Sequence, residues 1–110
     1  MTDARVVLVT APDTTAAERL VRALVDERLV ACGSIVPGVT SIYHWQGETQ
    51  REQEVQILLK TNESRIAALL DRVPALHPYA VPEVLVLAVA AGLGPYLDWV
   101  RRESEPAEAQ

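Results

Sequence analysis

The chain has 110 residues, the size of a single domain, and 49% of them are hydrophobic, which is enough for a buried core. Its formal net charge is −5, and its ten basic residues (nine Arg and Lys60) are scattered, so we exclude the basic patch that nucleic-acid binding requires. The longest apolar run near the C-terminus, residues 84–91, is too short to span a bilayer, and the N-terminus lacks a signal-peptide pattern. Cys32 is the single cysteine, so no disulfide can form within the chain. We therefore expect a cytoplasmic protein that does not bind membranes.

The first predicted elements are a strand and a helix. Residues 5–11 are rich in β-branched side chains and end before Pro12, a pattern typical of a buried strand. Apolar residues then recur at helical spacing over residues 14–28, with charged residues on the opposite face. Thr15 and Glu18 have the spacing of a capping box, which predicts where this helix begins.

A long β-hairpin is predicted next. Residues 31–45 are β-rich, and Pro37-Gly38 interrupts them. Because proline cannot donate a hydrogen bond to a ladder, we expect this strand to be bent or bulged there and to lie at a sheet edge. Residues 46–52 predict a polar turn, and residues 54–61 predict the returning strand.

The last part of the chain predicts a helix, a strand and a short helix. Thr61 or Asn62 is suited to cap the second helix, which Pro74 should end or kink near residue 73. Residues 84–90 predict an apolar strand, and residues 96–103 predict a short helix that begins after a proline.

This order of elements, βαββαβ plus a terminal helix, is the ferredoxin-like pattern. It predicts an α+β fold in which a four-stranded antiparallel sheet carries two helices on one face. We expect one domain over residues 1–110, with an ordered core at about 5–102 and a frayed tail at 103–110. The second and fourth strands would lie at the edges, and because both are long or apolar, we expect the chain to associate with copies of itself.

Five segments in this order resemble the CutA family, the divalent-cation tolerance proteins, over roughly residues 5–102. The resemblance implies a ferredoxin-like fold related to PII signalling proteins and a homotrimer in which edge strands pair between subunits. It also implies a role in tolerance of copper and other divalent metals, with no agreed catalytic reaction. The matching segments are TAPD (10–13), ERLVACGSIVPGVTSIYHWQG (27–47), EVQILLKT (54–61), HPYAVPE (77–83) and YLDWV (96–100).

Candidate metal ligands come from the segment HPYAVPE and from the cysteine. His77 and Glu83 align with the family's His-Pro-Tyr and Pro-Glu, and imidazole and carboxylate are suitable ligands for copper or zinc. The alternative is that HPYAVPE is only a rigid connector, since its two prolines favour extended backbone. Cys32 is interpreted as a small buried apolar residue, with a metal-ligand or redox role as the alternative.

The resemblance also suggests two candidate ligands, a cysteine and a second histidine that some relatives carry, and this chain has Val9 and Leu76 at those positions. Any copper or other divalent ion is therefore expected to bind weakly, and no cofactor is required.

Three other residues are candidates for contact with a small ligand. Tyr79 lies within HPYAVPE, Trp45 ends the predicted hairpin strand, and Lys60 is the chain's only lysine. Alternation places Tyr43 and Trp45 on one face of the strand, where they either bind a ligand or pack against the sheet or another subunit. Lys60 is either a ligand-binding charge or a solvated strand end.

The sequence favours a homotrimer that binds a metal ion or a small polar or anionic ligand in a cleft between subunits. The alternatives are a small-molecule enzyme or a PII-like signalling module with an anionic ligand. No catalytic residue is assigned, because the chain has no nucleophile elbow, Walker loop, zinc-protease helix or dinucleotide fingerprint.

Overall fold

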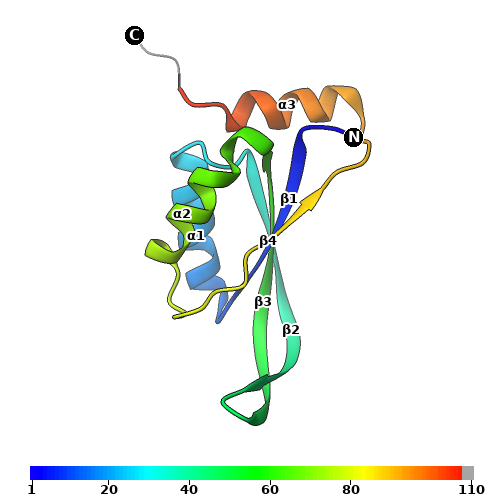
Figure 1. The fold of residues 1–110 in the computed structure, drawn as a ribbon. Helices are drawn as coiled ribbons and strands as arrows, with labels where there is room; N and C mark the ends of the chain where they lie inside the picture. Colours follow the sequence, from blue (N-terminus) through cyan, green and yellow to red (C-terminus); the bar gives the residue numbers. More distant parts are fainter. Residues whose placement is uncertain (108–110) are drawn as a thin grey trace.

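The computed structural model describes residues 1–107, which form an α+β sandwich. The strands of its one sheet lie in the order β2-β3-β1-β4, and every neighbouring pair is antiparallel. Helices α1 and α2 lie together beside one face of the sheet, and α3 lies across the end where β1 begins (Figure 1). The predicted ferredoxin-like fold is confirmed. The elements are β1 (Ala4–Ala11), α1 (Thr14–Asp26), β2 (Cys32–Trp45), β3 (Glu48–Asn62), the 3-10 turn η1 (Glu63–Arg65), α2 (Ile66–Leu76), β4 (Leu85–Ala88) and α3 (Gly94–Ser104).

The hydrophobic core lies between the sheet and the pair α1 and α2. Alternate residues of β1 and β3 point toward the helices, as the pairs Val7↔Leu59 and Val9↔Ile57 show. All four side chains are fully buried, so the middle of this face of the two central strands is apolar. The main helical contributions come from Ala17, Leu20, Leu24, Leu69 and Val73.

Helix α1 packs unusually close to strand β2 at Gly33. A Cβ atom at this position would lie 2.8 Å from Val21 Cγ1 and 2.9 Å from Leu59 Cδ2. Both distances are shorter than the usual separation of two carbon atoms in van der Waals contact. Glycine therefore sets the spacing between α1 and the sheet here.

The β2–β3 hairpin extends beyond the rest of the molecule as an arm (Figure 1). Its tip is a two-residue turn in which Gln46 has φ 52° and Gly47 has φ 82°, as a tight hairpin turn requires. The register shifts between Val36 and Val39, so the predicted bulge at Pro37-Gly38 is confirmed. Strand β3 begins at Glu48, within the segment predicted to be a turn, because the polar residues of the arm pair with β2.

The two long helices begin and end differently from the prediction. Asp13 is the N-cap of α1, and its Oδ1 accepts a hydrogen bond from Ala16 N at 2.8 Å, so the expected Thr15–Glu18 capping box does not form the cap. Helix α2 follows the 3-10 turn η1 and continues through Pro74 to Leu76. Pro74 is tolerated because its ring is exposed and lies within the last turn, which His77 N–H closes on Val73 O at 3.0 Å.

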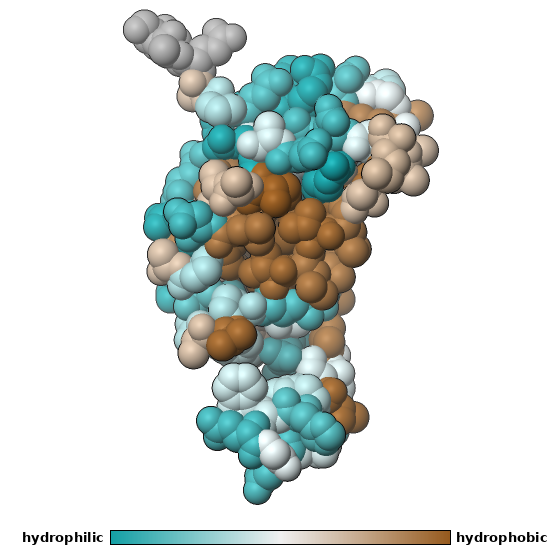
Figure 2. Space-filling model, in the orientation of Figure 1, coloured by the Kyte–Doolittle hydropathy of each residue, from teal (hydrophilic) through white to brown (hydrophobic). Residues whose placement is uncertain are grey.

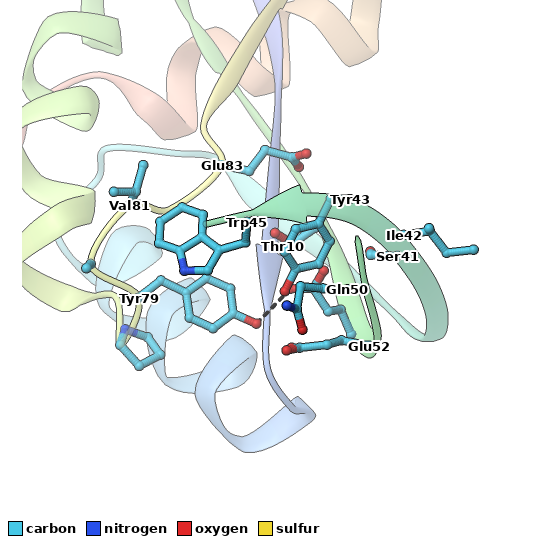
Figure 3. A pocket seen from close by; sticks show the side chains of 13 residues that line it. Thr10, Ser41, Ile42, Tyr43, Trp45, Gln50, Glu52, Tyr79, Val81 and Glu83 are labelled. Atoms are coloured by element: carbon cyan, nitrogen blue, oxygen red, sulfur yellow. Dashed lines mark hydrogen bonds between the residues drawn. The ribbon is translucent and has the colours of Figure 1, made fainter. Parts of the chain in front are cut away.

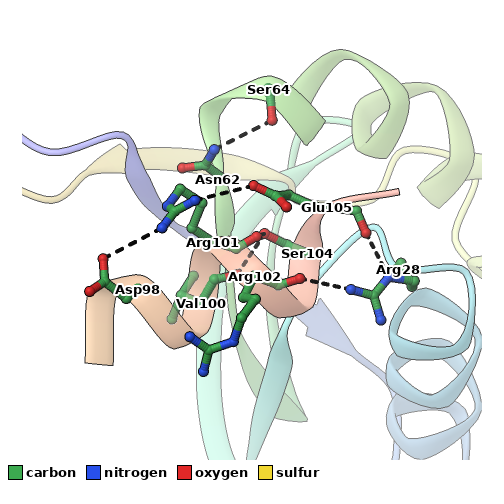
Figure 4. A network of polar contacts seen from close by, with 9 residues as sticks. All are labelled: Arg28, Asn62, Ser64, Asp98, Val100, Arg101, Arg102, Ser104 and Glu105. Carbon is green, nitrogen blue, oxygen red and sulfur yellow. Dashed lines mark hydrogen bonds and ion pairs between the residues drawn. The ribbon is translucent and has the colours of Figure 1, made fainter. Parts of the chain in front are cut away.

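Helix α3 is anchored at its C-terminal end by Arg28. The guanidinium donates to Glu105 O at 2.6 Å and to Arg102 O at 2.7 Å (Figure 4). A cation at these carbonyls satisfies acceptors that the helix leaves unpaired. The ordered chain therefore extends past residue 102, through the buried Ser104. The remainder of the predicted frayed tail, residues 108–110, lies outside the described residues.

Strand β4 forms one edge of the sheet and exposes its apolar side chains. Leu85, Val86 and Leu87 have exposed fractions of 54%, 37% and 46%. Apolar surface is prominent in the middle of the molecule, where β4 crosses the view (Figure 2). The other edge is β2, so both predicted edge strands are confirmed. Among residues 1–107, no helix has the length and apolar character needed to cross a membrane.

Candidate functional site

A cleft lies between the hairpin arm and the segment HPYAVPE, residues 77–83. Its volume is about 810 Å³, within the range of small-molecule sites. It brings together two of the three predicted ligand-binding residues, Trp45 and Tyr79, and one predicted metal ligand, Glu83 (Figure 3). The lining residues are Thr10, Ser41, Ile42, Tyr43, Trp45, Gln50, Glu52, Glu54, Pro78, Tyr79, Ala80, Val81 and Glu83.

The register of the hairpin explains how the arm supplies one wall of the cleft. Tyr43 pairs with Gln50, and Ser41 pairs with Glu52. Side chains of paired residues project to the same face of a sheet, and so do residues two apart on one strand. Ser41, Tyr43 and Trp45 therefore line the cleft beside Gln50 and Glu52, and the predicted common face of Tyr43 and Trp45 is confirmed.

His77 fixes the other wall by bridging two parts of the backbone. Its Nε2 lies 2.7 Å from Thr10 O, and its Nδ1 accepts a hydrogen bond from Tyr79 N at 3.0 Å. A carbonyl oxygen can only accept, so Nε2 carries the proton and the imidazole is neutral. Both ring nitrogens are thus used within the chain, and the ring is buried, with 8% exposed.

Tyr79 connects the loop to the arm through Glu54. Its hydroxyl donates to Glu54 Oε2 at 2.7 Å, and Glu54 is itself buried, with 8% exposed. Burial and this hydrogen bond to a carboxylate both raise the pKa of Tyr79, because they disfavour the phenolate. Burial and the charge of Glu52 likewise raise the pKa of Tyr43. The carboxylates of Glu52 and Glu54 thus place negative charge beside both tyrosines.

Glu83 is held near the cleft by Gln56. The Gln56 amide donates to Val9 O at 3.0 Å and makes a longer contact of 3.4 Å with Glu83 Oε2. The half-buried carboxylate keeps much of its acceptor capacity free for a ligand.

The remaining predicted site residues lie elsewhere. Lys60 is six residues from Glu54 along β3, which corresponds to about 20 Å, and its Nζ donates to Ser34 Oγ at 2.7 Å. Cys32 pairs with Lys60 across the sheet, and its Sγ lies 3.9 Å from Tyr96 Oη under α3. Neither residue lines the cleft.

His77 borders a separate, smaller depression of about 410 Å³ beside α1. Within residues 1–107, no group of three or more His, Cys, Asp or Glu side chains is placed to hold a metal ion. The structure thus does not assemble His77, Cys32 and Glu83 into one centre, and their roles as metal ligands stay predictions.

Glu52 and Glu54 line the cleft but are not among the site residues that the sequence predicts. The signal was present, because Glu48, Gln50, Glu52 and Glu54 alternate with the period of a strand. Residues 46–52 are also polar enough to predict a turn, and in a turn alternation does not assign side chains to a face.

Comparison with known proteins places this arrangement in a family. The family described as "CutA1 divalent ion tolerance protein" matches residues 5–103. The chain belongs to this family. The divalent-cation tolerance protein CutA of Thermus thermophilus is 50% identical over 99 residues, which are 90% of this chain and 96% of the relative. The corresponding CutA protein of Pectobacterium atrosepticum is 45% identical over 98 residues, 89% of each chain.

A solved structure supports the same assignment at the level of the fold. The crystal structure of CutA from Xylella fastidiosa superimposes with a TM-score of 0.92 at 42% sequence identity. The match covers 94% of this chain and 100% of the other. The CutA resemblance and the fold inferred from the sequence are thus both confirmed.

Proposed function

We propose that this CutA protein acts in the cytoplasm as a homotrimer in tolerance of divalent metal ions, copper among them, and that its cleft binds a cation. The observation that carries the proposal is the charge of the cleft. Glu52, Glu54 and Glu83 line it, and no Lys, Arg or His is among the described residues of its lining. A site with this lining attracts positive charge.

The two edges of the sheet support the proposed trimer. Strand β4 leaves Leu85, Val86 and Leu87 exposed, and β2 has a free edge along the hairpin arm. Free apolar edges of this kind are usually covered by another chain. Pairing of edges between three copies would bury them and would place neighbouring subunits close to the cleft.

The donor atoms do not fit a tightly bound, resident copper ion. Copper prefers nitrogen and sulfur ligands, but both nitrogens of His77 are hydrogen-bonded within the chain and Cys32 lies outside the cleft. We therefore propose that a divalent ion is held loosely and exchanges, with the cleft carboxylates as its first contacts.

The alternative of a signalling module with an anionic ligand has less support from the lining. An anion would require a basic side chain or free N–H groups in the cleft. Lys60, the one lysine of the chain, lies about 20 Å along β3 from Glu54. No particular observation in the cleft supports an enzymatic activity.

Native mass spectrometry of protein purified without added metal tests this proposal. We expect a species of three times the 12.0 kDa chain mass, to which copper(II) adds reversibly and from which a chelator removes it without dissociating the trimer. Glu83→Gln should weaken copper binding, whereas Glu18→Gln on the exposed face of α1 should not. A monomer, or equal copper binding by both variants, would contradict the proposal.

A further inference from the structure

We propose that the cleft, besides the loosely held divalent ion, binds an organic ammonium ion, a cation that carries alkyl groups. This inference rests on the proposed function in taking the cleft to be the cation site, and it names the class of ligand. Two features of the lining occur together here. Three aromatic rings, those of Tyr43, Trp45 and Tyr79, share the cleft with three carboxylates (Figure 3).

The carboxylates give the cleft its preference for positive charge. Glu52 and Glu54 lie two residues apart on β3 and therefore project to the same face. Arg51, between them, pairs with Ile42 and projects to the other face, so it does not neutralise them. The raised pKa values of Tyr43 and Tyr79 have Glu52 and Glu54 among their causes, which agrees with a negative potential inside the cleft.

The aromatic rings favour an organic cation over a small inorganic one. Aromatic faces attract ammonium groups through the ring quadrupole, and Trp does so best. Tyr43 and Trp45 are 38% and 49% exposed, so their rings have surface available to a ligand. A metal ion gains little from such rings, since it needs oxygen, nitrogen or sulfur ligands within about 2.0–2.6 Å.

The geometry of the carboxylates also separates the two kinds of cation. Glu54 already accepts the Tyr79 hydroxyl at 2.7 Å, and residues 1–107 contain no group of acidic, histidine or cysteine side chains placed to hold a metal ion. An ammonium ion needs no such inner shell. It is stabilised by nearby charge and by aromatic faces within about 6 Å.

The size and rim of the cleft indicate that the cation carries an apolar substituent. The volume of about 810 Å³ exceeds what a bare ammonium group fills. Val81 borders the cleft and is 70% exposed, and Pro78 and Ala80 also line it. Burial of an alkyl chain against these residues would add to the binding free energy.

Fluorescence of Trp45 measures this binding directly. The chain has two tryptophans, so Trp99→Phe leaves Trp45 as the only one. We expect butyltrimethylammonium chloride to change the Trp45 emission in a saturable way at constant ionic strength. The neutral probe 1-butanol and the anionic probe butyrate, which carry similar alkyl chains, should bind at least about tenfold more weakly, because they lack the charge that the rings and carboxylates attract.

Variants of the same protein separate a specific site from a general effect of charge. Tyr43→Leu should weaken butyltrimethylammonium binding by about five- to thirtyfold, and Glu52→Gln should weaken it severalfold. Glu18→Gln removes an equal charge from exposed α1 and should change nothing. Circular dichroism checks that each variant folds; both cleft positions lie at exposed places on the arm.

Equal responses to butyltrimethylammonium and 1-butanol, or equal losses in Glu52→Gln and Glu18→Gln, would overturn the inference. Absence of ammonium binding in a trimer that still binds copper(II) through Glu83 would overturn the inference alone. Failure of both the trimer and copper binding would instead contradict the proposed function.

Discussion

His77 illustrates how one residue of the segment HPYAVPE serves the fold. The imidazole donates to Thr10 O and accepts from Tyr79 N, so it ties the exit of α2 to strand β1 and sets the position of the tyrosine. Buried backbone groups need partners, and here a single side chain supplies two of them. Tyr79, two residues further on, and Glu83, at the end of the segment, line the cleft.

His77→Ala is predicted to lower the free energy of unfolding by about 1–3 kcal/mol, because it leaves Thr10 C=O and Tyr79 N–H without their partner. Urea unfolding at neutral pH measures the change. His44→Ala, at the exposed tip of the arm, is the matched control and should stay within about 0.5 kcal/mol of the parent. Unchanged stability of His77→Ala together with lost metal binding would instead support the role of His77 as a ligand.

The ionisation of Tyr79 is expected to change the stability of the protein at alkaline pH. Burial and the hydrogen bond to Glu54 raise the pKa of Tyr79 in the folded protein above its ordinary value of 10.0. The folded state then holds a proton that the unfolded chain has lost, so this contribution is complete below about pH 10 and declines as the pH rises further.

The stability of the parent protein should therefore fall more steeply than that of Tyr79→Phe above about pH 10. Urea unfolding of both proteins between about pH 8 and pH 11 measures the difference. Tyr43 and Tyr96 also have raised pKa values, but they are present in both proteins and cancel in the comparison. Parallel curves across this range would show that Tyr79 does not contribute in this way.

At the scale of elements, the sequence predicts what depends on local periodicity. The buried strands and amphipathic helices follow from patterns such as Val7, Val9 and Ala11, and the bulge follows from Pro37-Gly38. The features that the sequence does not predict are those for which two neighbouring residues could play the same role. Asp13 caps α1 although Thr15 also has a suitable side chain, and only the geometry of the entering chain decides between them.

The contact between α1 and β2 gives a prediction for Gly33. Gly33→Ala adds a methyl group within 2.8 Å of Val21 and 2.9 Å of Leu59, so the helix must move or the side chains must change rotamer. We expect a loss of about 1–3 kcal/mol in the free energy of unfolding, which thermal or urea unfolding measures. Gly94→Ala is the control, because nothing lies near its Cβ position and alanine favours the start of α3. Equal effects of the two changes would refute the packing argument.

At the scale of the whole molecule, the position of the cleft can be found only from the structure. Trp45, Glu54 and Tyr79 are distant in the sequence, and they meet because the bulged arm and the loop after α2 reach the same region. The sequence indicates Trp45, Tyr79 and Glu83 as candidates, but it does not separate them from Lys60 and Cys32, which lie toward the other end of the sheet. Which stretch of β3 lies beside the loop after α2 depends on tertiary packing, which no local pattern encodes.

The exposed edge of β4 is the place where the proposed trimer is most easily tested. Leu85 and Leu87 are two apart and pair with Leu8 and Val6 across the sheet, so they project to one face and expose 54% and 46% of their surface. Apolar side chains with this exposure contribute little to the core of a single chain. They contribute to association if a neighbouring subunit covers them.

The double variant Leu85→Lys, Leu87→Lys should therefore fold and remain monomeric. Burying two ammonium groups without partners in an interface costs several kcal/mol, whereas in a free chain both groups stay in water. Sedimentation velocity at low micromolar concentration should show about 12.0 kDa for the variant and three times this mass for the parent. Leu70→Lys, at a position on α2 that is 44% exposed, is the control and should leave the mass unchanged. A double variant that sediments with the parent would exclude the β4 edge from the interface.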